Sequence, residues 1–150
     1  MFEFIGKFVY IVLYFYWAWY LHGTNRARII VVAEGCVLLV KPWLGLGAWD
    51  LPGGGANKDE DFTVAACREL FEETRVRVDP EKAELVEKRE AKHGLIRFTA
   101  HYYFVPERAM TTPKPHRPEI AQARWISVEK LDSLKISPEV VGLIDLCRQR

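Results

Sequence analysis

The spacing of hydrophobic residues along the chain changes between two periods, one typical of strands and one typical of helices. Apolar, β-branched runs at residues 28–33 and 36–41 flank Glu34-Gly35, which predicts a β-hairpin. Further strands and helices are predicted as follows: short strands at 49–51 and 123–126, longer strands at 85–90 and 96–105, and helices at 61–74, 128–134 and 138–147. Strands interleaved with helices, with hairpins among them, predict an α/β fold whose mixed sheet carries helices on its faces.

The N-terminal segment is the most hydrophobic part of the chain. Residues 2–21 contain no proline and predict a helix, and residues 8–21 carry no charge and are rich in aromatic side chains. A helix that spans a bilayer needs about 20 apolar residues, and a shorter run is more often buried, so we expect this helix to pack on its own domain or on a second subunit in a homodimer. A membrane anchor or interfacial helix is the alternative, and disorder is a third. We therefore expect residues 1–22 to form a hydrophobic helix and residues 23–150 to form one domain.

Composition limits the function classes. A chain of 150 residues is long enough for one domain with a real core. Its formal net charge of +1 argues against strong attraction to a nucleic acid polymer. Cys36, Cys67 and Cys147 are odd in number and widely spaced, which argues against a disulfide framework. We expect a cytoplasmic protein, with association at the cytoplasmic face of a membrane if residues 8–21 act as an anchor.

Three glutamates on the predicted helix 61–74 are the first candidates for chemistry. Glu69, Glu72 and Glu73 have the spacing i, i+3, i+4, which makes them neighbours on the helix surface. Helical geometry places them roughly opposite an apolar face. Like charges this close are unfavourable, and a hard cation such as Mg²⁺, which binds carboxylate oxygens, would relieve the conflict. Alone, however, three glutamates also fit a solvated helix surface.

Glycines precede this helix. Gly53, Gly54 and Gly55 follow the predicted strand 49–51, where missing side chains let the backbone approach a metal ion or a phosphate. The amides of such a turn can also bind anions. No Gly-Lys-Ser/Thr sequence follows, so the segment is not a P-loop.

Together these residues form one spaced pattern. Five residues separate Gly54 from Glu60, and seven separate Glu60 from Arg68, which opens the sequence Arg-Glu-Leu-Phe-Glu-Glu. The segment from Gly54 to Val76 resembles the Nudix box, G-x5-E-x7-R-E-U-x-E-E-x-G-U, where U is aliphatic. One fixed position departs, because Arg75 stands where the box has glycine. Since that glycine normally ends the helix in a left-handed cap, we expect the helix to end differently here.

The resemblance implies the fold and the site. The fold would be the Nudix α/β/α sandwich with a mixed sheet. Mg²⁺, with Mn²⁺ as an alternative, would be held by Glu69, Glu72, Glu73 and the carbonyl of Gly53. Arg68 would hold a box glutamate in place, and Gly54 and Glu60 would support the site. Glu119, in a loop before a strand that contains Trp125, is our candidate for the general base, and Glu72 is the alternative.

The implied activity is hydrolysis of a diphosphate linkage in a nucleoside diphosphate joined to a moiety X. Two alternatives stay open: a membrane-associated enzyme that acts on a lipid-linked diphosphate, and a Nudix-fold module that binds a nucleotide without cleaving it. Complete box carboxylates favour an enzyme. Outside the box, Trp43 and Trp49 could stack on a base, although packing is the more common use of a tryptophan. His101 is expected to be packed or half-exposed. Lys114, His116 and Arg117 are expected to be solvated loop residues, with contact to substrate phosphates as the alternative.

Overall fold

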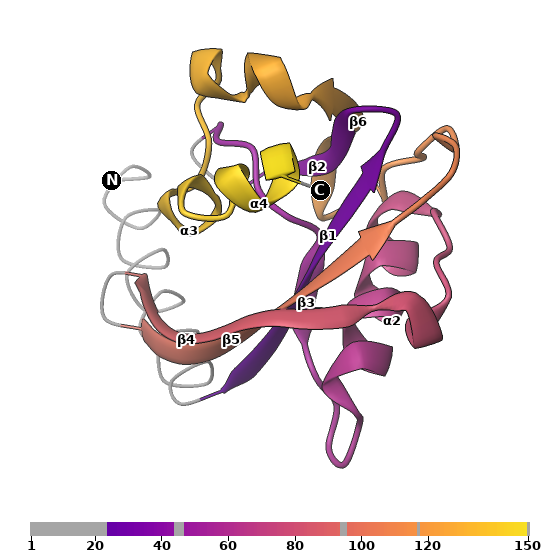
Figure 1. Cartoon of the computed structure of the whole chain (residues 1–150). Coiled ribbons are helices and arrows are strands. Elements are labelled where there is room, and N and C mark those ends of the chain that lie inside the picture. Colours follow the sequence, from indigo (N-terminus) through magenta and orange to yellow (C-terminus); the bar gives the residue numbers. More distant parts are fainter. Residues whose placement is uncertain (1–23, 44–46, 94–95, 117, 150) are drawn as a thin grey trace, which may run out of the picture.

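A computed structural model of the chain describes residues 24–43, 47–93, 96–116 and 118–149. In this part of the chain the strands form one six-stranded sheet, ordered β4-β5-β1-β2-β6 with β3 paired to β1 (Figure 1). The strands are β1 (Asn25–Ala33), β2 (Cys36–Pro42), β3 (Gly53–Gly55), β4 (Glu84–His93), β5 (Ile96–Pro106) and β6 (Ile120–Ser127). β1 and β5 run parallel, and the other pairs are antiparallel, which confirms the predicted mixed sheet.

Helices cover both faces of the sheet, as Figure 1 shows. α2 (Phe62–Thr74) packs on one face. The opposite face is covered by the 3-10 helix η2 (Val128–Ser133) and by α3 (Pro138–Val141) and α4 (Ile144–Gln149). A further 3-10 turn, η1 (Pro80–Lys82), precedes β4. This arrangement is the predicted α/β/α sandwich.

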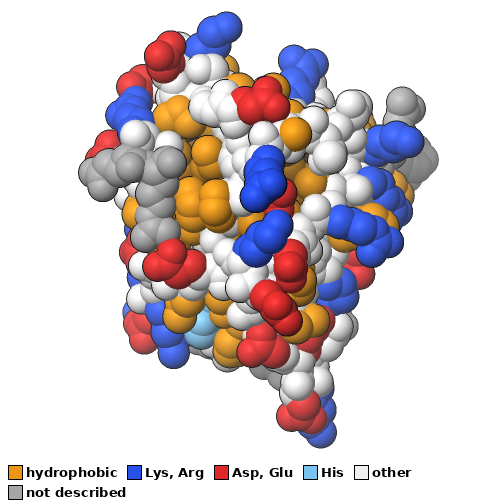
Figure 2. All heavy atoms as spheres, turned by 45° about the vertical axis from the view of Figure 1, so that its right-hand side comes forward, with side chains coloured by type: hydrophobic (Ala, Val, Ile, Leu, Met, Phe, Trp, Pro, Cys, Tyr) orange, Lys and Arg blue, Asp and Glu red, His pale blue; other side chains and the backbone are white. Residues whose placement is uncertain are grey.

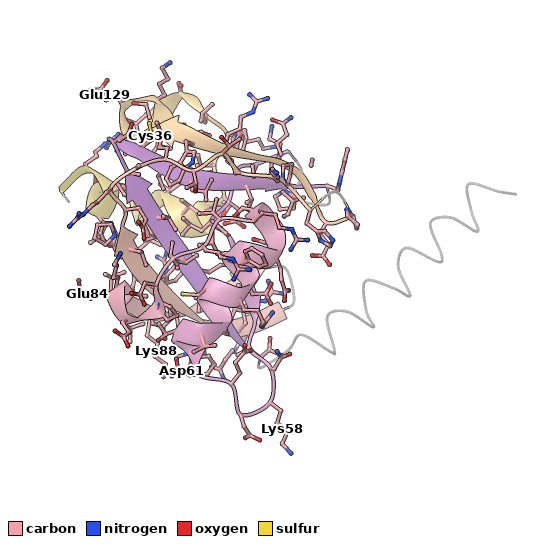
Figure 3. The ribbon with its side chains drawn as sticks, turned by 90° about the vertical axis from the view of Figure 1, so that its right-hand side faces the viewer. Cys36, Lys58, Asp61, Glu84, Lys88 and Glu129 are labelled. Carbon is pink, nitrogen blue, oxygen red and sulfur yellow. The ribbon has the colours of Figure 1, made fainter. Side chains whose placement is uncertain are left out.

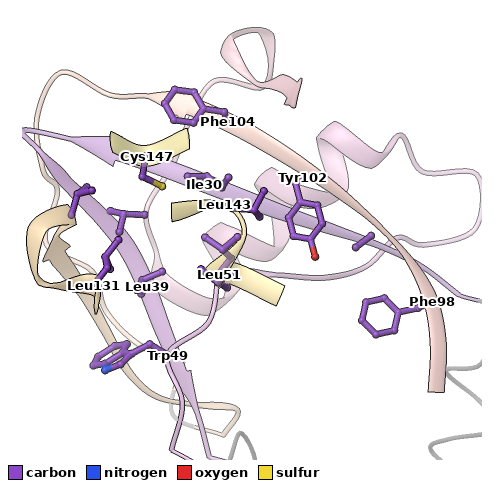
Figure 4. Close-up of a cluster of buried hydrophobic side chains, with 14 residues drawn as sticks. Ile30, Leu39, Trp49, Leu51, Phe98, Tyr102, Phe104, Leu131, Leu143 and Cys147 are labelled. Atoms are coloured by element: carbon purple, nitrogen blue, oxygen red, sulfur yellow. The ribbon is translucent and has the colours of Figure 1, made fainter. Parts of the chain in front are cut away.

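Alternating side chains of the central strands create the two cores. In β1, Ile29 and Val31 pack against α2, whereas Ile30 joins the cluster on the other face. That second cluster brings Trp49, Leu51 and Tyr102 together with side chains of η2 and the C-terminal helices (Figure 4). β1 is therefore buried on both sides, and residues at its ends are held rigidly in space.

The boundaries of α2 follow from its caps. The Asp61 carboxylate accepts hydrogen bonds from the amides of Thr63 and Val64, which confirms the predicted N-cap. At the other end, Arg75 is left-handed with φ 63°, and its N–H donates to the Phe71 carbonyl at 2.9 Å. Our expectation of a different ending was therefore wrong. The arginine adopts the cap conformation that glycine usually takes, at a cost of about 1 kcal/mol.

Three other elements differ from the sequence prediction. Residues 49–51 form only isolated bridges, Val40 with Asp50 and Trp49 with Ile136, and the strand is the glycine segment after them. Residues 128–133 form a 3-10 helix. The predicted helix 138–147 is two short helices, because the chain breaks its helical path around Gly142. For residues 49–51, the isolated pairing with Val40 and Ile136 accounts for the difference.

The predicted helix within residues 1–22 lies outside the described residues. Within the described ranges, no helix is long and apolar enough to cross a membrane.

Candidate active site

Two different strands pair with the two ends of β1 on the same edge. β2 pairs only with its end, at Val32 and Ala33, while β3 pairs with its beginning. Gly53 lies opposite Arg28 with φ 141°, and a Cβ there would lie 2.2 Å from the Ala27 carbonyl oxygen. Only glycine fits so close to the neighbouring strand. The glycine segment is thereby fixed between β1 and α2.

Glu73 contacts this segment directly. The Gly53 N–H donates to the Glu73 carboxylate at 3.0 Å. Burial raises the pKa of Glu73 to about 8, although the Gly53 hydrogen bond and the charge of Arg28 act in the opposite direction. A carboxyl group in this environment is stabilised as an anion only if more positive charge is brought to it.

Glu69 fills the space that Gly54 leaves. A Cβ on Gly54 would lie 2.5 Å from the Glu69 carboxyl carbon. Burial also raises the pKa of Glu69, and the Arg68 hydrogen bond lowers it; the charges of Glu72 and Glu119 raise it further. Glu69 therefore lies within the electrostatic reach of two other carboxylates.

Arg68 links the acidic side chains to one another. Its guanidinium donates two hydrogen bonds to Glu60, at 2.8 and 3.0 Å, and others to Glu69 at 2.8 Å, Glu72 at 3.3 Å and the Gly55 carbonyl at 3.0 Å. The Arg68 hydrogen bonds, with an amide hydrogen bond from Asn57, hold the pKa of Glu60 near 2. Arg68 thus compensates the charge of the cluster and fixes the loop before α2 to the helix.

The three glutamates are not equivalent, and two of them do not face away from the core as expected. The buried side chains of α2 are Ala65, Ala66, Leu70 and Thr74, and Glu69 and Glu73 lie in the same angular range. They point at β3, where glycines leave room, whereas the side chain of Glu72 is 53% exposed. Sequence periodicity did not predict this orientation, because it contains no information about the space that the glycines of β3 leave beside α2.

Glu119 reaches the site through an anchored loop. The amides of Lys114 and His116 donate to the carbonyls of Thr74 and Glu73 at the end of α2, and the Trp125 indole donates to Thr111. The Glu119 N–H then donates to the His116 carbonyl. Glu119 is exposed, and its charge raises the pKa of Glu69, so this carboxylate lies within electrostatic range of Glu69.

Sequence reasoning missed Arg28. Its guanidinium donates to the carbonyls of Leu51 at 2.9 Å and Gly53 at 3.3 Å, and it pairs with Asp50 at 3.5 Å. It therefore supports the segment that leads into the glycines. A charged residue within the apolar strand pattern was the available signal.

The remaining candidates, two tryptophans and a histidine, differ in their exposure to solvent. Trp49 is 7% exposed inside the core cluster (Figure 4), so it is not available to a base, whereas Trp43 is 64% exposed. The Trp43 N–H donates to the Glu119 carbonyl, which places Trp43 at the edge of the site. His101 is buried and stacks on Phe62, as expected for a structural histidine.

Acidic and basic side chains lie side by side on the face that carries α2 (Figure 2). In the part of the chain that the structure describes, no three His, Cys, Asp or Glu side chains are gathered closely enough to hold a metal ion as they stand. Arg68 occupies the position among Glu60, Glu69 and Glu72. A cation would have to take Glu69 and Glu72 from the guanidinium.

Comparisons with known proteins identify the family. The NUDIX domain model matches residues 23–146. The proteins named phosphatase NudJ of Escherichia coli K12 and of Shigella flexneri are each 33% identical over 106 residues, covering 68% of this chain and 67% of theirs.

Solved structures agree on the fold. The Nudix domain of Shewanella oneidensis NrtR, solved with ADP ribose, has a TM-score of 0.75 at 18% identity and covers 85% of this chain and 88% of its own. A MutT Nudix hydrolase from Burkholderia pseudomallei has a TM-score of 0.70 at 21% identity, with 83% and 97% covered. An Ap4A hydrolase from C. elegans has a TM-score of 0.68 at 17% identity, with 81% and 93% covered. The chain belongs to the Nudix family and is a Nudix-type diphosphohydrolase.

Proposed function

We propose that this enzyme hydrolyses a diphosphate linkage in a nucleoside-diphosphate-X substrate with the help of Mg²⁺, for which Mn²⁺ can substitute. The observation that carries the proposal is the grouping of Glu69 and Glu73 against the glycines of β3, with Glu119 acting electrostatically on Glu69. Glu69 and Glu73 are partly shielded from solvent, and the charges of Glu72 and Glu119 act on Glu69, so a cation would stabilise the group.

The donor set fits a hard divalent ion. Glu69, Glu72 and Glu73 offer carboxylate oxygens, and Gly53 offers a backbone carbonyl; these are the ligands that Mg²⁺ prefers. The missing Cβ at Gly54 lets the Glu69 carboxylate lie against the backbone of β3, because a Cβ there would meet its carboxyl carbon at 2.5 Å. When bound, the ion would neutralise phosphate oxygens and lower the pKa of a water molecule.

The side chains then have distinct roles. Glu119 would accept a proton from the attacking water, and Glu72 is the alternative base. Water adds to one phosphorus, the bond from that phosphorus to the bridging oxygen breaks, and two phosphorylated fragments leave. Arg68, which pairs with Glu60, would hold a box glutamate in place through the loop before α2. The Gly53 N–H would orient Glu73.

Substrate identity is the part that the site specifies least. ADP ribose and Ap4A, named for two structural relatives, are the first compounds to test. Exposed Trp43 beside Glu119 offers a surface on which an aromatic base can stack, which supports a nucleotide over a lipid-linked diphosphate.

A screen tests the proposal. Nucleoside diphosphate sugars, dinucleoside polyphosphates, nucleoside triphosphates and a prenyl diphosphate would be incubated with the enzyme in Mg²⁺, in Mn²⁺ and in excess chelator. We expect metal-dependent cleavage of at least one nucleotide, which the chelator abolishes. Binding of nucleotides without cleavage would favour a non-catalytic module, and cleavage of the prenyl compound alone would overturn the nucleotide assignment.

A further inference from the structure

The C-terminal end of α2 carries a group of basic residues that the hydrolytic site does not use. The Arg77 guanidinium carbon lies 3.8 Å above the centre of the Phe71 ring, and that of Arg75 lies 5.2 Å from the same centre. Both arginines are exposed. One aromatic ring thus holds two like charges near each other.

Neither arginine has an acidic partner. Among the described residues, no carboxylate lies within 4.0 Å of Arg75 or Arg77, although Glu72 is only three positions before Arg75. The contact with Phe71 is made through the ring face, and the described residues provide no hydrogen-bond acceptor for the side-chain N–H groups of either arginine. A guanidinium fixed in this way is suited to bidentate binding of a phosphate.

The backbone at Arg75 supports a binding role. A left-handed arginine costs free energy that glycine would not, yet arginine stands at this position. A favourable charge at the helix C-terminus offers a competing explanation, because cations stabilise that end of a helix. This interaction with the helix end does not explain why the left-handed position itself is an arginine, since Arg77 already places a positive charge at the same end.

The group lies at the C-terminal end of α2, the helix that carries the box carboxylates. Arg75 is two residues from Glu73 in the sequence, and Lys114, also basic and exposed, is hydrogen bonded through its amide to the Thr74 carbonyl. A substrate that is bound at the box carboxylates and extends past this end of α2 would meet positive charge there.

We infer that Arg75 and Arg77, stacked on Phe71, form a binding site for an additional phosphate group of the substrate, beyond the bond that is cleaved. The inference rests on the proposed function for the orientation of the substrate. It narrows the substrate class to diphosphates that carry a further phosphate, such as nucleoside triphosphates.

Two measurements test the site. The first compares kcat/KM for ATP and ADP with Mg²⁺ in wild type, Arg75→Gly and Arg77→Gln. The second measures binding of inorganic tripolyphosphate by calorimetry without added metal. Arg75→Gly is expected to fold, because glycine is favoured in the left-handed cap. Lys58→Gln is the matched control, since Lys58 lies at the tip of the loop before α2 (Figure 3).

We expect each arginine variant to lose about tenfold in tripolyphosphate affinity and in kcat/KM for ATP, mostly through KM, the size of one lost charged hydrogen bond. ADP turnover and the control should change less than twofold. Unchanged tripolyphosphate binding, or equal losses for ATP and ADP, would overturn the phosphate site. If wild type cleaves neither nucleotide, nor any other compound of the screen, while the arginines still govern tripolyphosphate binding, the proposed function fails and the site stands.

Discussion

The three glutamates of α2 differ in exposure and contacts because only two of them face the glycines of β3. Glu72 is exposed, Glu69 fills the space over Gly54, and Glu73 receives the Gly53 N–H. Their roles therefore depend on glycines that carry no chemistry of their own. Changes at those glycines should alter the site without removing any carboxylate.

Gly54→Ala is expected to reduce metal-dependent hydrolysis by at least about tenfold, because the new Cβ would meet the Glu69 carboxylate and displace it. Stability should change little, since the end of a flexible side chain can move. Gly55→Ala is the control, because a Cβ there has no atom within 4 Å. Initial rates and thermal unfolding of both variants give the answer; equal activity in the two would contradict the packing argument.

Glu60 should contribute stability with a defined pH dependence. Its pKa near 2 lies below the ordinary value of 4.5, so its ion pair with Arg68 stabilises the fold above about pH 4.5, and this contribution is lost as the pH falls toward 2. Glu60→Gln should lower the free energy of unfolding at pH 7 by on the order of 1 kcal/mol.

Urea unfolding between pH 7 and pH 3 measures this difference. The gap between wild type and Glu60→Gln should narrow toward acid pH, while Glu81→Gln, at an exposed glutamate, should follow wild type throughout. A gap that is constant with pH would show that the contribution is not electrostatic.

At the scale of elements, the two ends of α2 were predictable to different degrees. Asp61 predicted the N-cap, because a short side chain with an acceptor oxygen can accept hydrogen bonds from the first amides of a helix. At Arg75 the box position indicated a left-handed cap, but the residue type argued against one, and the structure shows that the position decided the outcome. The residue type was therefore the reliable signal at the first end and the misleading one at the second.

The cap can be tested directly. Asp61→Ala should lower the midpoint of thermal unfolding by roughly 2–4 °C, because the amides of Thr63 and Val64 lose their acceptor. Asp61→Asn keeps an acceptor oxygen and should remain near wild type. If the alanine and asparagine variants melt together, the hydrogen bonds do not explain the capping.

For the whole molecule, hydrophobic periodicity and the spaced box were enough to predict the sandwich and to name Glu60, Arg68 and the three glutamates. They could not place β3 beside the beginning of β1, or Arg28 beneath the glycines, because both depend on pairing between distant segments. The orientation of Glu69 and Glu73 toward the core could not be predicted for the same reason, because it depends on the position of β3. The helix predicted within residues 1–22 stays a prediction.

The central claim, that the carboxylates of α2 bring a divalent cation to a diphosphate, is tested most directly by the rate of Glu72→Gln. With the best substrate of the screen and saturating Mg²⁺, this exposed position should fold normally, and kcat should fall at least about a hundredfold, close to 3 kcal/mol of lost transition-state stabilisation. Glu129→Gln, far from α2 (Figure 3), should keep wild-type turnover. Near-wild-type turnover by Glu72→Gln would contradict the account.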